Sequence, residues 1–256
     1  MTFPVYLHIF GLKVHPHFLF ETLAYPLGFL VFRGLKKRFG DSVSEGMRWT
    51  VIAAAAVGAA VGSKLLYWLE DPRLMLAHWH DPQVIWGGKT VVGALIGGLI
   101  AVEWAKRRLH YTSRTGDLFA VPLCVGIAIG RIGCFLTGLS DDTYGTPTRL
   151  PWGIDFGDGI PRHPAPIYEI IFLAVLGCVL LWAMRRPHVQ GDIFKGFMVG
   201  YSAWRLGVDF LKPDPRFFGM SSLQWACLAL LLFYAPDIRR WLVRAGPEAA
   251  IAASKS

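Results

Sequence analysis

Charge is scarce in this chain. Asp, Glu, Lys and Arg make up 17% of its 256 residues, whereas apolar residues make up 54%. The apolar residues come in long blocks rather than in stripes of helical period, which is typical of polytopic membrane proteins and not of soluble domains. The basic residues behind the net charge of +8 sit in short clusters between these blocks, with no basic face that carries interleaved aromatics. This pattern argues against nucleic-acid binding and favours contact with anionic lipid headgroups.

Cysteine is sparse as well. The four cysteines all fall within or beside apolar blocks: Cys124, Cys134, Cys178 and Cys227. No pair has CxxC spacing, so the sequence indicates neither a disulfide framework nor a zinc site, and it indicates no organic cofactor. The N-terminal stretch MTFPVYLHIFGLKVHPHF lacks a basic region and a small-residue cleavage site ahead of its first apolar run. We therefore expect an external tail that leads into a retained helix, not a signal peptide.

Seven apolar blocks approach the length of about 20 residues that a helix needs to cross a bilayer. They cover residues 17–35, 49–69, 87–105, 117–139, 166–184, 194–211 and 222–235. The predicted fold is thus all-α, a polytopic bundle of about seven transmembrane helices. We expect one transmembrane domain over residues 1–240, with an outer loop at 140–165 and a disordered cytoplasmic tail at 241–256.

The distribution of Lys and Arg predicts the orientation of the bundle. One set of connections, together with the C-terminal tail, holds sixteen of these residues, and the opposite set holds six. The richer side is expected to be cytoplasmic, which places the N-terminus outside and the C-terminus inside. An odd number of spans agrees with this. The chain has no internal repeat, which argues against a transporter. A continuous polar path across both membrane halves would favour a transporter.

Glycines four residues apart recur in the apolar blocks. The pairs are Gly58/Gly62, Gly93/Gly97, Gly126/Gly130 and Gly196/Gly200. Small residues at this spacing let helix backbones approach closely in lipid, so we expect these glycines to pack helices together.

Charged residues inside the predicted spans are costly and are therefore functional candidates. They are Glu21, Lys64, Lys89, Glu103, Asp117, Arg131, Glu169, Arg205 and Asp209. Glu103 and Asp117 lie near cytoplasmic ends, where an interfacial salt bridge or a helix N-cap explains them. Lys64 either extends to the outer surface or helps to hold an anion.

Arg205 and Asp209 are four residues apart in WRLGVDFLKPD, on one helix face that continues to Lys212. An intrahelical pair would satisfy both charges, but three charges at the outer end of an apolar helix exceed what such a pair requires. Arg131 lies in GRIGCF and, because a guanidinium stays charged, needs a permanent anionic partner. Glu169, Asp209 or a lipid phosphate could serve.

A proline-dense block, PRHPAPIYE, brings Arg162, His163, Tyr168 and Glu169 close together after the outer loop. Prolines restrict the backbone and so hold these side chains in place. His163 is the residue type that titrates near neutral pH. Lys89 follows two glycines in WGGKTVVGALIGG, where it could face a headgroup. Several cations and two carboxylates thus converge at the outer half of the bundle, and the physically sensible ligand is an anionic phospholipid.

These blocks resemble the bacterial prolipoprotein diacylglyceryl transferases over nearly the whole chain from about Tyr25. GRIGCFLTG is similar to the family signature of Gly-Arg, an apolar residue, Gly-Asn-Phe, an apolar residue and Asn-Gly. PRHPAPIYE resembles the family's Arg-His-Pro-Ser-Gln-Leu-Tyr-Glu, and GYSAWRLGVDFLKPD resembles its Gly-Tyr-Gly block with an Arg and a Glu four residues apart. GMSSLQ is similar to Ser-Met-Gly-Gln, and GGKTVVGALIGG stands where the family has a glycine run with His-Gly-Gly-Leu-Ile-Gly.

The resemblance implies a multi-pass protein of the bacterial inner membrane that transfers the diacylglyceryl group of phosphatidylglycerol to the lipobox cysteine of a prolipoprotein and releases glycerol phosphate. Prolipoprotein signal peptides would then be partners. Arg131 and Arg205 would hold the phosphate, and Asp209 would replace the family's glutamate and orient Arg205. His163 or Glu169 would accept the proton of the nucleophile. The remaining expected substrate-binding residues are Arg162, Tyr168, Lys89, Tyr25 and Lys212.

The chain departs from the family pattern at several positions. The family's third-span histidine falls on Val92, and the two signature asparagines fall on Cys134 and Thr137. The following acidic residue becomes Leu139, and the family's tyrosine near the first span aligns near Glu21, with Tyr25 only a neighbour. Phosphate-binding cations are thus kept while acceptor and proton-handling residues change. Two alternatives follow, namely a paralogue with another acceptor and a non-catalytic lipid-binding protein. Cys134 itself is expected to be a packed thiol.

Overall fold

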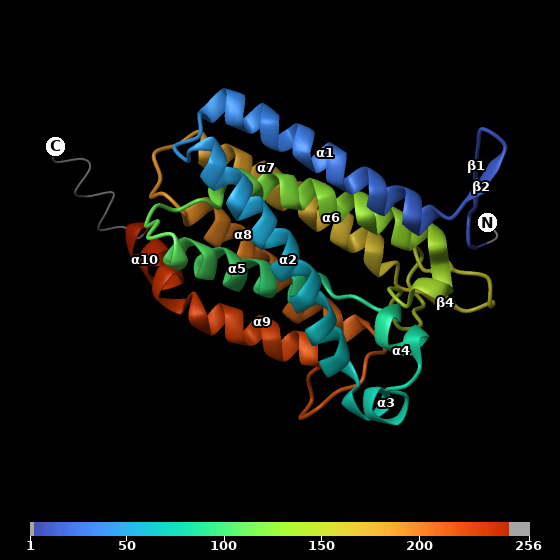
Figure 1. The fold of residues 1–256 in the computed structure, drawn as a ribbon. Helices are drawn as coiled ribbons and strands as arrows, with labels where there is room; N and C mark the ends of the chain where they lie inside the picture. Colours follow the sequence, from blue (N-terminus) through green and yellow to red (C-terminus); the bar gives the residue numbers. More distant parts are fainter. Residues whose placement is uncertain (1–2, 246–256) are drawn as a thin grey trace.

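The computed structural model describes residues 3–245, which form a bundle of helices with two very short β-hairpins at one end (Figure 1). The helices are α1 (Pro16–Phe39), α2 (Glu45–Glu70), α3 (Pro72–Ala77), α4 (Pro82–Gly87), α5 (Val91–Arg108), α6 (Asp117–Thr137), α7 (Ala165–Met184), α8 (Asp192–Val208), α9 (Ser222–Phe233) and α10 (Ala235–Ala245). Two 3-10 turns, η1 (Gly138–Asp141) and η2 (Asp209–Leu211), follow α6 and α8.

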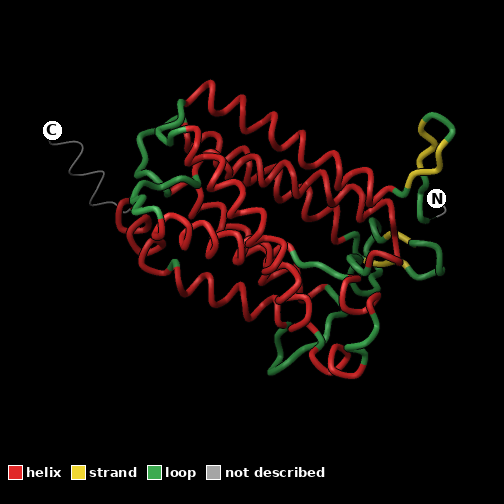
Figure 2. Tube along the Cα trace, viewed as in Figure 1, coloured by secondary structure: helices red, strands yellow, loops and turns green. Residues whose placement is uncertain are grey.

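The hairpins are antiparallel and lie outside the bundle. One pairs β1 (Leu7–Ile9) with β2 (Leu12–Val14), and the other pairs β3 (Ile154–Asp155) with β4 (Pro161–Arg162). Figure 2 shows that strands and loops gather at the ends of the long helices. In Figure 1 the N-terminal hairpin lies at one end of the bundle and α10 at the other.

Each of the seven predicted spans overlaps mainly with one helix, from 12 residues in α9 to 26 in α2. Four segments are long and apolar enough to cross a membrane: Pro16–Phe39, Glu45–Glu70, Asp117–Asp141 and Ala165–Met184. The Ser222–Phe233 helix is apolar but shorter. The prediction of a helical, multi-pass membrane protein is therefore confirmed.

Two predicted boundaries differ from the structure. The span expected at 87–105 begins at Val91, because Gly87 closes α4 and the Thr90 side chain caps α5 by accepting from the Gly93 N–H at 3.1 Å. The last span ends at Phe233, and α10 then continues to Ala245. The tail predicted at 241–256 thus begins inside a helix, and its remainder, 246–256, lies outside the described residues.

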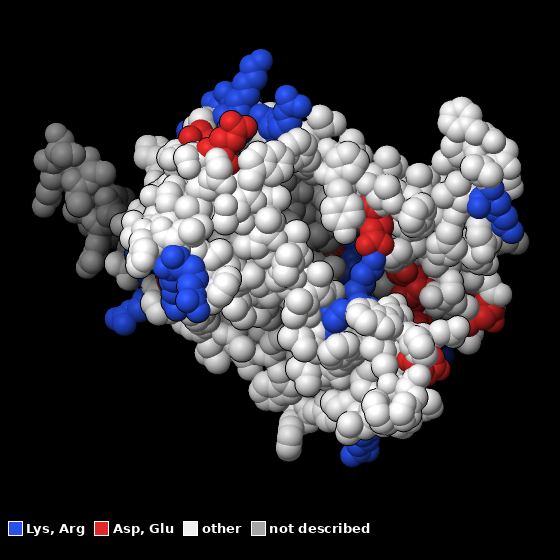
Figure 3. Space-filling model, in the orientation of Figure 1, with Lys and Arg blue, Asp and Glu red and all other residues white. Residues whose placement is uncertain are grey.

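The surface of the bundle is largely apolar. Figure 3 shows charged side chains at the ends and around one hollow, with uncharged surface over much of the helices between them. Large exposed apolar residues occur on most of the long helices, among them Phe29, Val61, Ile100, Val175 and Phe233. In water such a surface would be unfavourable, but against lipid tails it is not, which agrees with a membrane location.

Helices α2 and α5 touch backbone to backbone. A Cβ added at Gly58 would lie 2.3 Å from the Gly97 carbonyl oxygen, and one at Gly62 would lie 2.4 Å from the Gly93 oxygen. The packing role expected of these two glycine pairs is therefore confirmed. At Gly130 a Cβ would meet nothing within 4 Å, so the pair Gly126/Gly130 does not form such a contact.

Polar contacts join the helices at the end opposite the hairpins. Arg48 at the start of α2 forms a buried ion pair with Asp41 and donates to the Thr115 carbonyl at 2.6 Å. Burial alone raises the pKa of Asp41, but hydrogen bonds from Arg48 and the Val43 N–H outweigh it and hold that pKa below its ordinary value. These contacts tie the α1–α2 connection to the start of α6.

Asp117 caps a helix other than its own. Its carboxylate accepts from the N–H groups of Gly191 at 2.6 Å and Phe194 at 3.0 Å, at the start of α8. The predicted N-cap role is thus right in kind, but the capped helix is α8 rather than α6. Glu103 forms the expected interfacial ion pair with Lys106 at 2.8 Å.

Candidate functional site

A buried cluster of charges lies between α6, α7 and α8. Glu169 on α7 forms ion pairs with both arginines: its Oε2 lies 2.9 Å from Arg131 Nε and accepts a hydrogen bond from Arg205 Nη1 at 3.2 Å. Its other oxygen, Oε1, accepts from the Tyr201 hydroxyl at 2.6 Å. All four residues are buried, with exposed fractions of 8% or less. Of the partners proposed for Arg131, the structure selects Glu169.

Helical spacing explains how α8 supplies its part of the cluster. Tyr201, Arg205 and Asp209 follow one another at intervals of four residues, so they lie on one face that points to α7. Arg205 Nη2 lies 2.7 Å from Asp209 Oδ1, which confirms the predicted i,i+4 pair. Asp209 begins the turn η2, and the N–H of Lys212 donates to the Asp209 carbonyl at 3.1 Å. Lys212 is buried beside them.

The fully buried side chains of the cluster carry more positive than negative charge. Three buried cations, Arg131, Arg205 and Lys212, face two buried carboxylates, Glu169 and Asp209, and the more exposed Glu70 and Asp214 lie near Lys212. In addition, the buried Nε atoms of Arg131 and Arg205 have no hydrogen-bond acceptor among residues 3–245, and the carboxylate oxygens of Asp209 have no donor. A buried donor without an acceptor is costly, as is an uncompensated buried charge. The cluster is therefore suited to bind an anion.

The outer loop between η1 and α7 holds a second group of predicted residues. His163 follows β4, is partly buried, and its Nδ1 lies 3.2 Å from the hydroxyl of Tyr168 in the first turn of α7. That hydroxyl also accepts from Trp152 Nε1 at 2.8 Å. The loop is held to the bundle, since the His163 N–H donates to the Thr146 carbonyl at 3.1 Å. His163 and Tyr168 thus form a connected pair near Glu169 in sequence.

Arg162 is paired within the loop. Its guanidinium donates two hydrogen bonds of 2.6 Å to Asp158 and lies over the ring of Tyr144. A hydrogen bond to Arg162 lowers the pKa of Asp158, and the same contact raises the pKa of Arg162. The structure therefore joins Arg162 to a loop carboxylate and not to the cluster of Arg131 and Arg205.

Three other predicted residues also lie apart from the buried cluster. Lys89, half-exposed, forms an ion pair with Glu21 on α1. Tyr25 is 72% exposed on α1. Lys64 donates to the carbonyls of Trp86 at 2.6 Å and Gly88 at 2.5 Å, so it ties α4 to α2 and is neither extended to the surface nor free to hold an anion. Arg162, Lys89 and Lys64 thus have partners outside the buried cluster of Arg131 and Arg205.

A second cluster was not expected from the sequence. His17 at the start of α1, Cys134 in the last turn of α6 and Asp141 at the end of η1 bring their ligand-type atoms within 4.8 Å of one another. Arg131 connects this cluster to the first, since its Nη1 donates to Cys134 Sγ at 3.7 Å. Tyr201 was also missed as a site residue, although its position four residues before Arg205 is a signal that could have found it.

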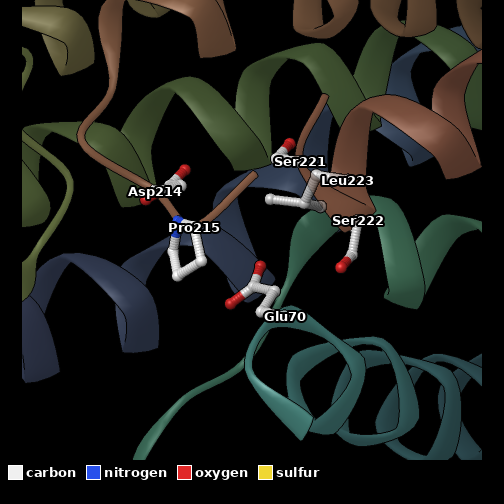
Figure 4. Close-up of a pocket in the computed structure, with 6 residues that line it drawn as sticks. All are labelled: Glu70, Asp214, Pro215, Ser221, Ser222 and Leu223. Carbon is white, nitrogen blue, oxygen red and sulfur yellow. The ribbon is translucent and has the colours of Figure 1, made fainter. Parts of the chain in front are cut away.

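A small cleft beside α2 does not have the properties of a headgroup site. It encloses about 30 Å³ and is lined by Glu70, Asp214, Pro215, Ser221, Ser222 and Leu223 (Figure 4). Figure 4 shows the carboxylates of Glu70 and Asp214 on its walls. This volume holds about one water molecule, and two carboxylates repel a phosphate.

Comparisons with known proteins agree on one family. A family model described as prolipoprotein diacylglyceryl transferase matches residues 4–236. The phosphatidylglycerol–prolipoprotein diacylglyceryl transferase of Paracidovorax citrulli is 31% identical over 248 residues, which cover 90% of this chain and 92% of that protein. The protein of that name from Cupriavidus necator is 31% identical, with coverages of 90% and 89%, and that from Clostridium tetani is 30% identical, with coverages of 83% and 86%. No solved structure matches the chain.

Proposed function

This chain belongs to the prolipoprotein diacylglyceryl transferase family and transfers a diacylglyceryl group from phosphatidylglycerol to prolipoprotein, and we propose that the donor phosphate binds at the cluster of Arg131, Glu169 and Arg205. The observation that carries this assignment is the excess of cations over carboxylates among the buried side chains, together with the Nε atoms of Arg131 and Arg205, which have no hydrogen-bond acceptor in the described residues. A phosphate would supply both the missing negative charge and the missing acceptor.

The two arginines have the same task in the reaction. The thiol sulfur of the acceptor cysteine attacks the glycerol carbon, the bond from that carbon to the phosphate oxygen breaks, and glycerol phosphate leaves with the electron pair. Negative charge develops on the leaving phosphate, and preorganised guanidinium groups in a water-poor site stabilise it. Arg131 and Arg205 are already held in place by Glu169, so they need little reorganisation when the charge develops.

Glu169 is better suited to orient than to accept a proton. Two guanidinium groups and the Tyr201 hydroxyl all stabilise its ionised form. His163 remains as proton acceptor for the thiol, because imidazole commonly serves near neutral pH and Tyr168 holds the ring. Asp209 keeps Arg205 in position from the other side.

The topology that accompanies this function has seven crossings. The C-terminal ends of α1 and α5 carry the basic runs Lys36–Arg38 and Lys106–Arg108, and chain order places both at the end of the bundle where α10 lies (Figure 1). The concentration of Lys and Arg supports a cytoplasmic location for this end. The N-terminus and the loop at 140–165 then face outward from the bacterial inner membrane, where prolipoprotein signal peptides would reach the site.

One assay tests the assignment. The purified protein is incubated with phosphatidylglycerol and a lipobox peptide, and mass spectrometry measures the diacylglyceryl adduct and the released glycerol phosphate. We expect both products from the parent and from Arg186→Ala, an exposed arginine at the far end of α7. Arg131→Ala and Arg205→Ala should lose both. Turnover at the parental rate by these two variants would refute the phosphate site, and glycerol phosphate without adduct would indicate another acceptor.

A further inference from the structure

Three side chains of different chemistry meet at the outer end of α1 and α6. His17, Cys134 and Asp141 offer an imidazole nitrogen, a sulfur and a carboxylate oxygen within 4.8 Å of one another. Cys134 is buried, and the side chains of His17 and Asp141 are 28% and 9% exposed. Among the three side chains, that of His17 is thus the most exposed.

The backbone explains why residues so far apart in sequence meet. Helix α1 starts against the last turn of α6, where a Cβ on Gly133 would lie 3.1 Å from the Cα of His17. Helix α6 then ends at Gly138, whose φ of +74° is a conformation that glycine adopts without strain. The chain continues from there into η1, which places Asp141 beside His17.

The contacts inside the cluster are not those of a completed hydrogen-bond network. His17 Nδ1 lies 2.6 Å from Asp141 Oδ1, but the two are not aligned as donor and acceptor. This buried nitrogen therefore has no hydrogen-bond partner in the described part of the chain. The other ring nitrogen, Nε2, faces Glu21 Oε2 at 3.4 Å. One imidazole thus stands between two carboxylates and beside a thiol.

The donor set selects the kind of ion. Magnesium and calcium prefer oxygen ligands only, whereas a thiolate with an imidazole and a carboxylate suits zinc. Zinc bonds of about 2.0–2.3 Å require donor atoms roughly 3–4 Å apart, which small side-chain rotations reach from the present spacing. Two anionic ligands would neutralise the charge of the ion, so the neighbouring Arg131 does not oppose binding. Sites with three protein ligands keep a fourth position open.

We propose that His17, Cys134 and Asp141 bind a zinc ion whose open position takes the thiol of the acceptor cysteine. This inference rests on the proposed function, because it places the acceptor next to the donor phosphate. Zinc deprotonates a coordinated thiol, and the thiolate is the nucleophile. The released proton passes to His163, the acceptor proposed above. The sulfur then attacks the glycerol carbon as the carbon–oxygen bond to the phosphate breaks.

Arg131 would connect the two halves of the reaction. Its Nη1 contacts Cys134 Sγ at 3.7 Å, and its Nε lies 2.9 Å from Glu169 Oε2. The metal ligand and the phosphate cluster are therefore one side chain apart. Cys134 is also one of the positions at which the chain departs from the family signature, so the thiol-activating device would be specific to chains that carry this cysteine.

Zinc content tests the site without any lipid. The full chain is purified in detergent, incubated with zinc chloride, desalted and analysed by atomic emission. We expect about one zinc per chain in the parent and in Cys124→Ser, a buried cysteine of the same helix that has no histidine beside it. Cys134→Ser, His17→Gln and Asp141→Asn should each lose at least about a hundredfold in zinc affinity, since even outer-shell changes cost about 10–100-fold.

Cobalt(II) provides a second readout in case one variant folds poorly. Thiolate coordination to cobalt gives a strong charge-transfer absorption, which we expect in the parent and in His17→Gln at high cobalt concentration but not in Cys134→Ser. Absence of zinc from the parent, or equal zinc in the parent and Cys134→Ser, would overturn the proposal.

Transfer assays separate this inference from the proposed function. Chelation of the parent should abolish adduct formation, and zinc should restore it, whereas Arg131→Ala should keep its zinc and lose transfer. A parent that binds no zinc and yet transfers fully would refute the zinc site and leave the transferase function intact. A parent that binds zinc but transfers equally well without it would refute the role in thiol activation.

Discussion

Two arginine–carboxylate pairs of this protein have similar geometry and different surroundings. Arg162 and Asp158 pair through two hydrogen bonds of 2.6 Å on the outer loop, and Arg205 pairs with Glu169 and Asp209 at 3.2 and 2.7 Å inside the bundle. Water screens the charges of the exposed pair and hydrogen-bonds to both groups when the pair breaks. The buried groups have no water to replace a lost partner, so the stability of each charge depends on the others. An arginine that contacts one exposed carboxylate therefore stabilises a loop, whereas one that contacts two buried carboxylates can form the centre of a binding site.

Glu169→Gln should give the largest effect on folding. The substitution leaves Arg131 and Arg205 buried without their shared carboxylate, which costs about 3–5 kcal/mol in free energy of unfolding. Chemical denaturation in detergent measures it. Asp158→Asn is the matched control on the exposed pair and should leave the denaturation midpoint nearly unchanged. Equal shifts for the two variants would contradict the role given to burial.

Arg205→Lys keeps the positive charge but should cause a large loss of activity. A lysine has one ammonium group and cannot contact Glu169 and Asp209 with two separate nitrogens while facing a phosphate. Loss of one preorganised donor costs about 10²–10³ in rate. The rate of adduct formation measures this. Arg162→Lys should stay within a few-fold of the parent, and a comparable loss there would place Arg162 in the reaction.

Tyr201→Phe should produce an intermediate effect. It removes the hydroxyl that donates to Glu169 Oε1 at 2.6 Å, and a hydrogen bond to a charged group is worth about 1.5–3 kcal/mol. We expect a loss of that size in the free energy of unfolding. Tyr168→Phe, at a partly exposed hydroxyl in the outer loop, is the control and should have a smaller effect on unfolding.

The smallest expected effect is the response to acid of a buried carboxylate, Asp41, compared with that of the exposed Asp158. The pKa of Asp41, held down by Arg48 against the effect of burial, lies below its ordinary value of about 3.9. Stability from this ionised carboxylate is complete above that value and is lost as the pH falls through the lowered pKa. Asp41→Asn should therefore flatten the acid side of the stability profile. Asp158→Asn should flatten it less, and the reverse order would refute the comparison.

Much of the helical architecture could be predicted from the sequence. A segment that crosses a bilayer must span the thickness of its hydrocarbon core and satisfy its backbone hydrogen bonds internally, which leaves few alternatives to long apolar helices. The pair Arg205–Asp209 was predictable too, since helical periodicity alone determines it. The choice of Glu169 as partner of Arg131 was not, because it depends on how α6, α7 and α8 pack. Asp117 could be assigned as a cap but not to α8, which begins 75 residues further along the chain.

Other residues were misplaced because periodicity does not describe loops. Lys64 and Arg162 find partners in segments with no regular pattern, the Gly87–Gly88 turn and the loop around Asp158. The cluster of His17, Cys134 and Asp141 combines residues more than a hundred positions apart. Spacing rules for metal sites require neighbours in sequence, so they could not detect a site that helix packing assembles.

The contact between α2 and α5 has a consequence for variation. At Gly58 and Gly97 a single added methyl group would stand 2.3 and 2.2 Å from a facing carbonyl oxygen, with no flexible side chain to move aside. The two backbones would have to separate along their length to admit it. These positions lie outside both the arginine cluster and the cluster of His17, Cys134 and Asp141, yet an added side chain there requires the backbone to move. The contact between α2 and α5 thus limits which sequences can fold rather than which reaction the protein catalyses. A natural variant altered there should also carry a compensating change on the opposite helix.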